Sequence, residues 1–417
     1  MKIAVVGAGV VGLATAHELF CAGHGVTLLE RRGTAAEEGS FAPAGLLHPA
    51  WALAWSAPLP RLQWPWTSPG TAVRWRAGVD LQAWRWWWRW RNAGRRRDPQ
   101  AEAALQDLLT IGQERLQDLT AELELDHDRS DGALVLLRDD REKARAQPLV
   151  DRLREAGLAL RLVASDEARA IEPALNPDQP LAAAVHLQGP AVANCREWAL
   201  IIRQRLLQSG SQVLSRASVE SLTASNGGIS IGLSDGSDEW FDAAVLCNGI
   251  DAPALMAPLG MTAPFQVTWS HSLSAPVREP MDAPASAVID PVRRVLLTRL
   301  GQRVRSSGTI DLGGGPGKPD AACVRHLAQA MSDWFPAAAR LGGTQAALQT
   351  WRGAMLNAPD GLPVVGASRV AGLWLNIAHG PIGWASACGS ARRLADALSG
   401  ASTTRSDGHL APARLGL

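Results

Sequence analysis

The sequence predicts an α/β fold: a parallel sheet that carries a glycine-rich turn, joined to an α+β part built on antiparallel strands. A strand, glycine turn, helix and second strand follow one another within residues 3–30. A further strand runs into a glycine at 242–249, and short apolar runs at 287–289, 295–298 and 302–306 suggest antiparallel strands. With 417 residues, the chain is long enough for two cooperating domains.

The first 30 residues form a nucleotide-binding signature. An apolar run at residues 3–6 suits a buried strand, and Gly7, Gly9 and Gly12 follow it as GxGxxG before a helical pattern. Gly7 permits a tight turn, Gly9 lets the backbone approach a pyrophosphate, and Gly12 lets helix and strand pack closely. Glu30 ends the second strand, where an acidic residue accepts hydrogen bonds from ribose hydroxyls. The pattern therefore predicts an adenine dinucleotide cofactor.

Composition excludes several classes of partner. The formal net charge of +1 and a pI near 7.8 give no reason to expect nucleic acid. The 5 cysteines are scattered and form no CxxC pair, so we expect no disulfide framework and no metal site, as in a reducing cytosol. The chain opens on a strand rather than a secretion signal, and its longest uncharged stretch, 41–60, contains four prolines. We expect a cytoplasmic protein without a transmembrane helix.

The aromatic composition limits the chemistry that the protein can perform. The chain contains 17 Trp, 5 Phe and no Tyr. No phenol can therefore serve as an acid, base or hydrogen-bond donor, and the indole N–H of Trp only donates. Polar contacts to a substrate must come from other side chains, the backbone or a cofactor.

A strand, turn and helix near the C-terminus form a second candidate cofactor contact. A strand from residue 373 runs into a glycine-rich turn and then into a helix at 391–398. That arrangement points backbone N–H groups and a positive helix end at a ligand above it, which suits the flavin edge that becomes anionic on reduction. From the residues alone, a plain strand–turn–helix stays the alternative.

These segments together resemble a known family. The Gly7/Gly9/Gly12/Glu30 signature, the segment 39–45 and the segments 359–366 and 373–389 are similar to the D-amino-acid dehydrogenase small-subunit family, within the D-amino-acid oxidase, glycine oxidase and sarcosine oxidase group. The resemblance covers nearly the whole chain. It implies FAD, a Rossmann-like FAD-binding domain made of 1–60, 192–265 and 350–417, and a discontinuous α+β substrate domain made of 61–191 and 266–349.

The resemblance also implies the residues that contact FAD. Gly7, Gly9, Gly12 and Glu30 would bind the ADP half, Ala44 and Gly45 would pass near the flavin, and the turn after His379 would lie under its pyrimidine edge. The full set of expected contacts is Gly7, Gly9, Val10, Val11, Gly12, Glu30, Arg31, Ala44, Gly45, Val219, Asn248, Gly249, Gly380, Pro381, Ile382, Gly383 and Trp384.

The chemistry implied by the resemblance is oxidation of a C–N bond. A hydride passes from the carbon that bears the amine to flavin N5, and positioning supplies most of the rate. The expected partners are a small amine or amino-acid substrate and quinone or oxygen as electron acceptor. Two alternatives stay open: a secondary amine or imino-acid (proline- or sarcosine-like) dehydrogenase or oxidase, and a non-catalytic flavoprotein or electron-transfer subunit.

The substrate side departs from the family. Met355 stands where relatives place a carboxylate-binding Arg, and Trp269-Ser-His271 stands where they often have Lys-Gly-Tyr. We hypothesise that Arg293 supplies the missing guanidinium, with Arg352 as the other candidate and a solvated loop charge as the alternative for Arg293. The candidate catalytic residues are therefore Arg293, His271, Met355 and Trp269.

Two histidines and one cysteine have plainer interpretations beside the functional ones. His48 and His271 are more typical of structural hydrogen bonding than of catalysis, although His271 could hold the amine or a polar substrate tail. We expect Cys388 to be a small core residue.

Residues 83–97 are rich in Trp and Arg and have two interpretations. Trp and Arg together are favoured at a membrane interface, and a dehydrogenase that reduces quinone would benefit from peripheral contact with the inner face of the membrane. The alternative is a core helix over the substrate pocket, with Arg95, Arg96 and Arg97 at a solvated end.

Overall fold

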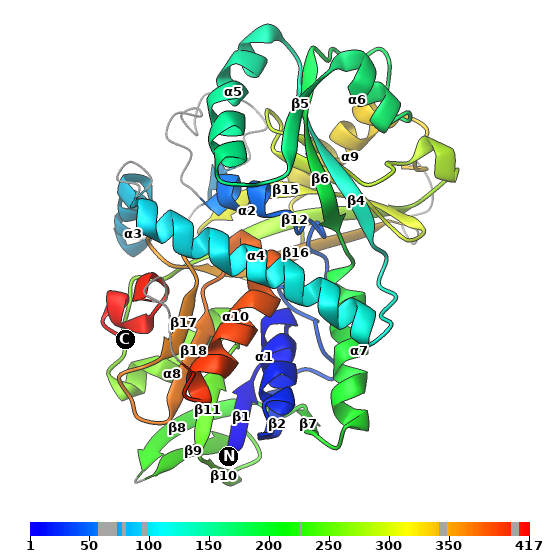
Figure 1. The fold of residues 1–417 in the computed structure, drawn as a ribbon. Coiled ribbons are helices and arrows are strands. Elements are labelled where there is room, and N and C mark those ends of the chain that lie inside the picture. The colour runs from blue at the N-terminus through cyan, green and yellow to red at the C-terminus, as the bar shows by residue number, and fades with distance from the viewer. Residues whose placement is uncertain (57–72, 77–80, 94–97, 226, 342–347, 402–407) are drawn as a thin grey trace.

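The computed structural model describes residues 1–56, 73–76, 81–93, 98–225, 227–341, 348–401 and 408–417. Two sheets dominate these residues (Figure 1). The first has six strands in the order β17-β18-β11-β1-β2-β7, and the second has nine strands. This mixed α/β architecture confirms the fold class expected from the sequence.

The six-stranded sheet is parallel except at one edge. Its strands are β1 (Lys2–Val6), β2 (Gly25–Glu30), β7 (Gln212–Ser215), β11 (Ala243–Leu246), β17 (Val364–Ala367) and β18 (Leu373–Ile377). Only β17 pairs in the antiparallel sense, with β18. Ile3 and Val5 pack into one core cluster and Ala4 and Val6 into another. Both faces of β1 are thus buried, which explains its continuous apolar run.

Helices cover one face of this sheet, and a small sheet covers the other. α1 (Val10–Cys21) packs between α7 (Cys195–Gln208) and α10 (Gly383–Leu398). On the opposite side lie the antiparallel strands β8 (Val219–Ser225), β9 (Gly228–Leu233) and β10 (Asp238–Phe241), followed along the chain by the short helix α8 (Ala252–Met256). Because β1 and β11 are neighbouring parallel strands, the glycine turns that follow them lie side by side. A Cβ at Gly7 would stand 2.8 Å from the Asn248 Cα.

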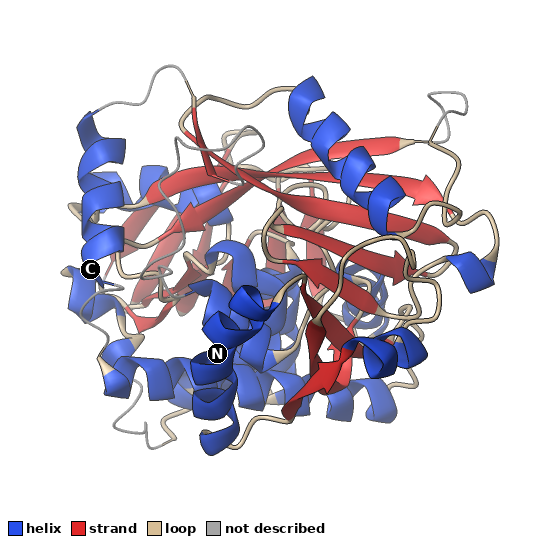
Figure 2. Cartoon of the chain, turned by 90° about the horizontal axis from the view of Figure 1, so that it is seen from above, coloured by secondary structure: helices blue, strands red, loops and turns tan. Residues whose placement is uncertain are grey.

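The second sheet follows the order β16-β12-β15-β14-β13-β4-β6-β5, with β3 on β15. Figure 2 shows the strands of the protein in red, with helices in blue around them. Its strands are β3 (Val73–Trp75), β4 (Ser130–Leu137), β5 (Leu160–Ala164), β6 (Ala183–Val192), β12 (Gln266–Pro276), β13 (Ala287–Asp290), β14 (Val295–Leu300), β15 (Arg303–Leu312) and β16 (Gln349–Asn357). Pairing is antiparallel except for β13 with β4 and β15 with β3. α9 (Ala321–Trp334) packs on β12 and β15, and α5 (Asp140–Glu155) and α6 (Ser165–Ile171) lie against β5 and β6.

One long helix, α4 (Pro99–Glu122), crosses between the two halves of the molecule (Figure 1). Asp98 caps it by accepting from the Gln100 N–H at 2.9 Å. Gly112 of α4 meets Gly389 of α10 almost backbone to backbone, because a Cβ at Gly389 would stand 2.1 Å from the Leu108 carbonyl oxygen. Part of the 61–191 range thus packs on the dinucleotide half. The expected boundary at 350 likewise falls inside β16, which pairs with β12 of the second sheet.

Candidate active site

A cavity of about 600 Å³ lies where the two sheets meet. The turns after β1, β11 and β18 form its floor, and residues of β12, β14, β15 and β16 form the opposite wall. The chain segment 38–46 lines one side. Segments far apart in the sequence therefore enclose one space, which is large enough for most of a dinucleotide and a small substrate.

The floor begins at the N-terminus of α1. Gly7 has φ +101°, and a Cβ at Gly12 would stand 1.8 Å from the Gly7 carbonyl oxygen, so only glycine allows this close approach of helix and strand. Gly9 is the N-cap and makes no side-chain cap. Ser40 accepts from the Val10 N–H at 3.0 Å. The positive end of α1 therefore faces the cavity beside a hydroxyl from the segment 38–46.

An acidic and a basic residue mark one end of the cavity. Glu30 is buried and accepts from the N–H groups of Ala8 at 2.7 Å and Arg32 at 2.8 Å. Arg31 forms ion pairs with Glu38 at 3.0 Å and with Asp251 at 2.9 Å. These contacts hold the end of β2 against the glycine turn, as an adenosine subsite requires.

The turn after β18 is held by a buried polar network. Asn376 Oδ1 accepts from His379 Nε2 at 3.0 Å, the other ring nitrogen of His379 lies 2.8 Å from Ser386 Oγ, and Asn376 donates to Thr15 Oγ1 at 3.0 Å. Burial lowers the pKa of His379 to about 4, so the imidazole is neutral. Ala378 adopts φ +60° and Gly380 φ +52°, which turns the chain sharply into α10. The network fixes the backbone N–H groups under the cavity.

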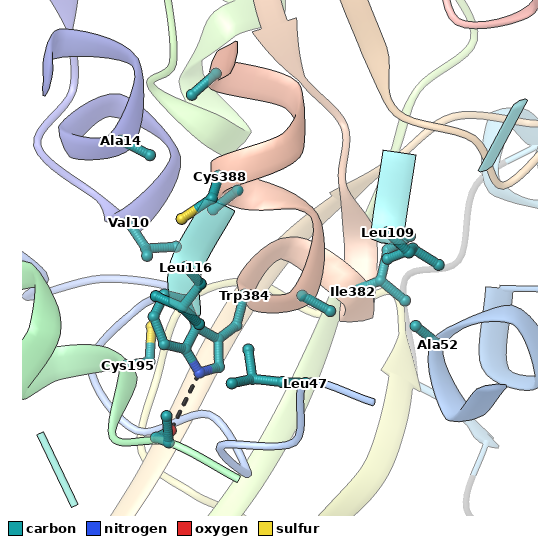
Figure 3. Close-up of a cluster of buried hydrophobic side chains, with 14 of the residues drawn as sticks. Val10, Ala14, Leu47, Ala52, Leu109, Leu116, Cys195, Ile382, Trp384 and Cys388 are labelled. Atoms are coloured by element: carbon teal, nitrogen blue, oxygen red, sulfur yellow. Dashed lines mark hydrogen bonds between the residues drawn. The ribbon is translucent and has the colours of Figure 1, made fainter. Parts of the chain in front are cut away.

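Trp384 supports this turn from below (Figure 3). Its indole donates to the Ala193 carbonyl oxygen at 3.1 Å, and its ring lies among Val10, Leu47 and Cys195. Cys388 is buried in the same apolar cluster, in keeping with the core role expected of it, and burial raises the pKa of its thiol. Cys388 is therefore unreactive.

The opposite wall is decided by the register of β12 and β16. Thr268, Ser270 and Ser272 pair with Met355, Gly353 and Trp351. Because paired residues share a face of a sheet, these side chains lie on one face, and Met355, Trp351 and Ser270 line the cavity. Ser307 of β15 pairs with Ser272 and also lines the cavity. Its buried hydroxyl has no hydrogen-bond partner among the described residues.

His271 and Trp269 belong to the other face of β12. His271 borders the cavity and is fully buried, but Nδ1 lies 3.0 Å from Thr309 Oγ1 and Nε2 lies 3.7 Å from Asp311 Oδ2. Burial lowers the pKa of His271 to about 4. Trp269 is not among the lining residues and donates to the Gly314 carbonyl oxygen at 3.2 Å. The contacts of both side chains fit structural roles.

The two candidate guanidinium groups lie outside the cavity lining. Asp290 accepts from the N–H of Arg293, and this turn directs the Arg293 guanidinium to Asp333 of α9 at 2.5 Å. The hypothesis that Arg293 faces the substrate is therefore corrected. Arg352 donates to the Gly315 carbonyl oxygen at 2.5 Å and stacks on Trp269 with its Cζ 4.4 Å from the ring centroid.

His48 also has structural partners. Its Nε2 lies 3.1 Å from the Gln188 carbonyl oxygen, and its Nδ1 accepts from the Ala50 N–H at 3.2 Å. Burial lowers its pKa. These contacts agree with the structural interpretation made from the sequence.

The structure brings the residues expected to contact the cofactor together around the first cavity. Sixteen of the seventeen line the cavity, and Gly12 lies behind it at the helix–strand contact. Other residues that line the cavity were not expected from the sequence, among them Glu38, Ser40, Asp251, Trp351 and Ser307. Ser40 carries a signal, since it lies in the segment 39–45 that resembles the family. Ser307 carried no such signal in the sequence. The strand was expected to end at residue 306, so the pattern of alternating side chains did not extend to Ser307.

The residues present fit FAD. The glycine cradle at the end of α1 excludes side chains where a pyrophosphate would lie, and Asn248 Oδ1 is a buried acceptor without a partner among the described residues. The turn at 379–383 would lie beneath the flavin. Arg31 is the only Lys or Arg among the described residues of the lining, and it stands at the adenosine end. The wall near Met355 therefore presents no guanidinium from this part of the chain.

Comparison with known proteins shows the family to which the chain belongs. The model of a family described as "FAD dependent oxidoreductase" matches residues 2–397. The chain belongs to this FAD-dependent oxidoreductase family. It is 32% identical over 413 residues to a D-amino acid dehydrogenase of Cereibacter sphaeroides, covering 96% of this chain and 92% of that one. It is 31% identical over 407 residues to a D-amino acid dehydrogenase of Agrobacterium fabrum, covering 96% of each.

Solved structures show the same fold. Glycine oxidase from Geobacillus kaustophilus superimposes with a TM-score of 0.74 at 18% identity, covering 97% of this chain and 96% of that one. L-proline dehydrogenase from P. horikoshii superimposes with a TM-score of 0.73 at 17% identity, covering 99% and 97%. The FAD-dependent oxidoreductase described here therefore has the FAD cofactor and the enzymatic class expected from its sequence.

Proposed function

We propose that this FAD-dependent oxidoreductase oxidises the C–N bond of a D-amino acid or a related amine, with a substrate site altered from that of its relatives. The relatives at 32% and 31% identity are D-amino acid dehydrogenases. The observation that carries the proposal is the cavity itself, with a dinucleotide cradle on its floor and the face of Met355, Trp351 and Ser307 on its opposite wall. Bound FAD supplies the acceptor for the hydride that leaves the carbon bearing the amine.

The protein's own part in this reaction is positioning. Trp351 and Met355 offer apolar surface that excludes water. The Ser307 hydroxyl, which has no partner among the residues that the structure describes, can accept from an amine or donate to a carboxylate. Neutral hydroxyl donors would then do what a guanidinium does in the family, with weaker hold on a carboxylate. This difference is the reason to expect an altered substrate.

Anaerobic mixing with D-alanine, L-proline, sarcosine and simple amines tests the proposal. We expect one class to bleach the flavin absorbance at about 450 nm. Bleaching by L-proline or sarcosine alone would replace the D-amino acid assignment with the imino-acid one, and no bleaching by any compound would contradict the enzymatic proposal. Ser307→Ala should raise KM about two- to tenfold. Ser306→Ala is the matched control, because the Ser306 hydroxyl donates to Leu327 of α9 instead.

We further propose that α3 (Leu81–Ala93) touches an anionic membrane surface and that the electron acceptor is a quinone. None of the helices in the described part of the chain combines the length and apolar character needed to cross a bilayer. In α3, Trp86 and Trp87 are buried, whereas Leu81, Trp84 and Trp88 are 63%, 45% and 52% exposed. The helix contains no acidic residue, and Arg85 and Arg89 are exposed beside these tryptophans. Arg95, Arg96 and Arg97 lie outside the described residues.

Sedimentation with anionic liposomes tests the membrane contact. The protein should pellet with the liposomes at moderate salt and be released at high salt, because arginines attract anionic lipid. The double variant Trp84→Ser/Trp88→Ser should stay in the supernatant. Trp240→Ser, which removes another tryptophan that is 45% exposed, on β10, should pellet like the wild type. Equal pelleting of all three proteins would contradict the contact through α3.

A further inference from the structure

A second cavity, of about 760 Å³, lies beside α7 at the ends of β15 and β16. Its described lining shares no residue with the first cavity. Four arginines surround it, Arg196 and Arg205 from α7 and Arg303 and Arg305 from β15. Glu197 is the only acidic residue in the described lining. A hollow with this excess of positive side chains is unusual in a chain whose formal net charge is +1.

Neutral groups contact all four of these arginines, and Arg303 donates to the Ser274 carbonyl oxygen at 2.9 Å. Arg305 donates to the Pro43 carbonyl oxygen at 2.7 Å and to Ser274 Oγ at 2.9 Å. Arg205 donates to the Leu123 carbonyl oxygen at 3.0 Å, and the Arg196 guanidinium stacks over the Phe41 ring, with its Cζ 4.2 Å from the centroid. These contacts orient the guanidinium groups without neutralising their charge.

The arginines also repel one another. Burial lowers the pKa of Arg305 to about 10, and the charges of Arg303 and Arg196 act in the same direction. The first turn of α7 adds its positive end, since Arg196 is the second residue of that helix. Like charges gathered in a hollow without a bound anion are unfavourable, and an anion placed between them removes that cost.

This cavity adjoins the active site through a thin partition. Phe41 lines the second cavity, and its ring centroid lies 6.5 Å from that of Trp351, which lines the first. Pro43 lines the first cavity and accepts from Arg305, which lines the second. An anion held by the arginines would therefore lie directly behind the segment 38–46, which lines one side of the first cavity.

We propose that the second cavity is a binding site for a small carboxylate, of the class to which the amino-acid substrate and its 2-oxo acid product belong. The choice of carboxylate rests on the proposed function, whereas the anion site rests on the arginines alone. Inorganic phosphate shares the oxyanion chemistry and is the other ligand to compare.

Titration calorimetry of the FAD-loaded enzyme with pyruvate and with inorganic phosphate tests the proposal. We expect pyruvate to bind without changing the flavin absorbance, since the site lies outside the cofactor cavity. Arg196→Gln should weaken binding about tenfold or more, as loss of a charge-assisted hydrogen bond does. Burial raises the pKa of Glu197 to about 7, so at pH 8, where the carboxylate is charged, Glu197→Gln should tighten binding by removing that charge from the lining. Arg203→Gln is the matched control: it lies on the same helix and outside both linings, and it should bind like the wild type.

Several outcomes would overturn the proposal. Absence of binding by either anion, or equal binding by the wild type and Arg196→Gln, removes the site. Binding of phosphate alone removes the carboxylate assignment. A change in flavin absorbance on binding places the anion in the first cavity instead. If Arg196→Gln melts at a much lower temperature than the wild type, Arg205→Gln is used in its place, because Arg205 lines the same cavity. Calorimetry measures anion binding without turnover. If no substrate bleached the flavin, the proposed function would fail, but the anion site would still be supported by the calorimetry.

Discussion

Met355 stands opposite Thr268 in the β12–β16 pair, on the sheet face that covers the cavity. Its thioether therefore faces the cavity, and it does so at the position where the resemblance in the sequence leads us to expect a guanidinium. Met355→Arg should lower KM for a D-amino acid by about tenfold or more, because a bidentate pair with the carboxylate would form in a partly dry site. Steady-state kinetics that separate KM from kcat measure the effect.

Met355→Leu is the control for this exchange, since it keeps the volume and apolar character of the side chain. It should leave KM within about twofold of the wild type. A folded Met355→Arg protein with an unchanged KM would show that the substrate carboxylate does not reach this wall.

Gly12 tests the dinucleotide cradle. A Cβ at this position would stand 1.8 Å from the Gly7 carbonyl oxygen, which is backbone and cannot swing away. Gly12→Ala should therefore lose FAD during purification and destabilise the fold by roughly 1–3 kcal/mol. The ratio of flavin to protein absorbance and the Tm measure the two effects. Gly25→Ala is the control, because its Cβ would meet only the Met1 carbonyl oxygen at 3.7 Å. Full flavin occupancy in Gly12→Ala would argue against the cradle.

The dinucleotide half could be predicted because its contacts are local in sequence. Gly7, Gly9 and Glu30 lie within one βαβ unit, so spacing alone places them in space. The turn after β18 carries its own glycine and helix signals. The second strand that ends on glycine, β11, was also expected, and its turn lies against Gly7.

The substrate wall could not be predicted because it depends on register. One residue of shift along β12 exchanges Ser270 for His271 on the cavity face, and the sequence does not encode that alignment over short range. The expectation that Arg293 faces the substrate was wrong for a similar reason, because its position depends on a residue distant in the sequence. Its partner, Asp333, lies on α9, a helix that the sequence analysis did not identify. Long-range packing therefore decided the position of both residues.

The close contact between α4 and α10 should make the stability of the protein sensitive to side-chain size at Gly112. A Cβ at Gly112 would stand 2.9 Å from the Ala385 carbonyl oxygen, and the two helices would have to separate to admit it. Gly112→Ala should destabilise the protein by roughly 1–3 kcal/mol and shift the turn that precedes α10. Urea unfolding followed by tryptophan fluorescence measures the loss. Gly315→Ala, at an open position, should have no such effect. Equal midpoints for the two variants would contradict the close packing of α4 and α10.

His271 makes the protein sensitive to acid. Burial lowers the pKa of this histidine from 6.5 to about 4 in the folded chain, as it does for His127 and His379. Below pH 6.5, His271 binds a proton in the unfolded chain but stays neutral in the folded chain. The free energy of unfolding should therefore fall as the pH drops from about 6.5 to about 4. His271→Gln keeps a polar partner for Thr309 and should make this fall shallower. Urea titrations of the wild type and His271→Gln at pH 7, 6 and 5 measure the slope. If His271→Gln and the wild type lose stability in parallel over this range, the imidazole of His271 is already protonated in the fold, and its contact with Asp311 is an ion pair rather than a contact of a neutral ring.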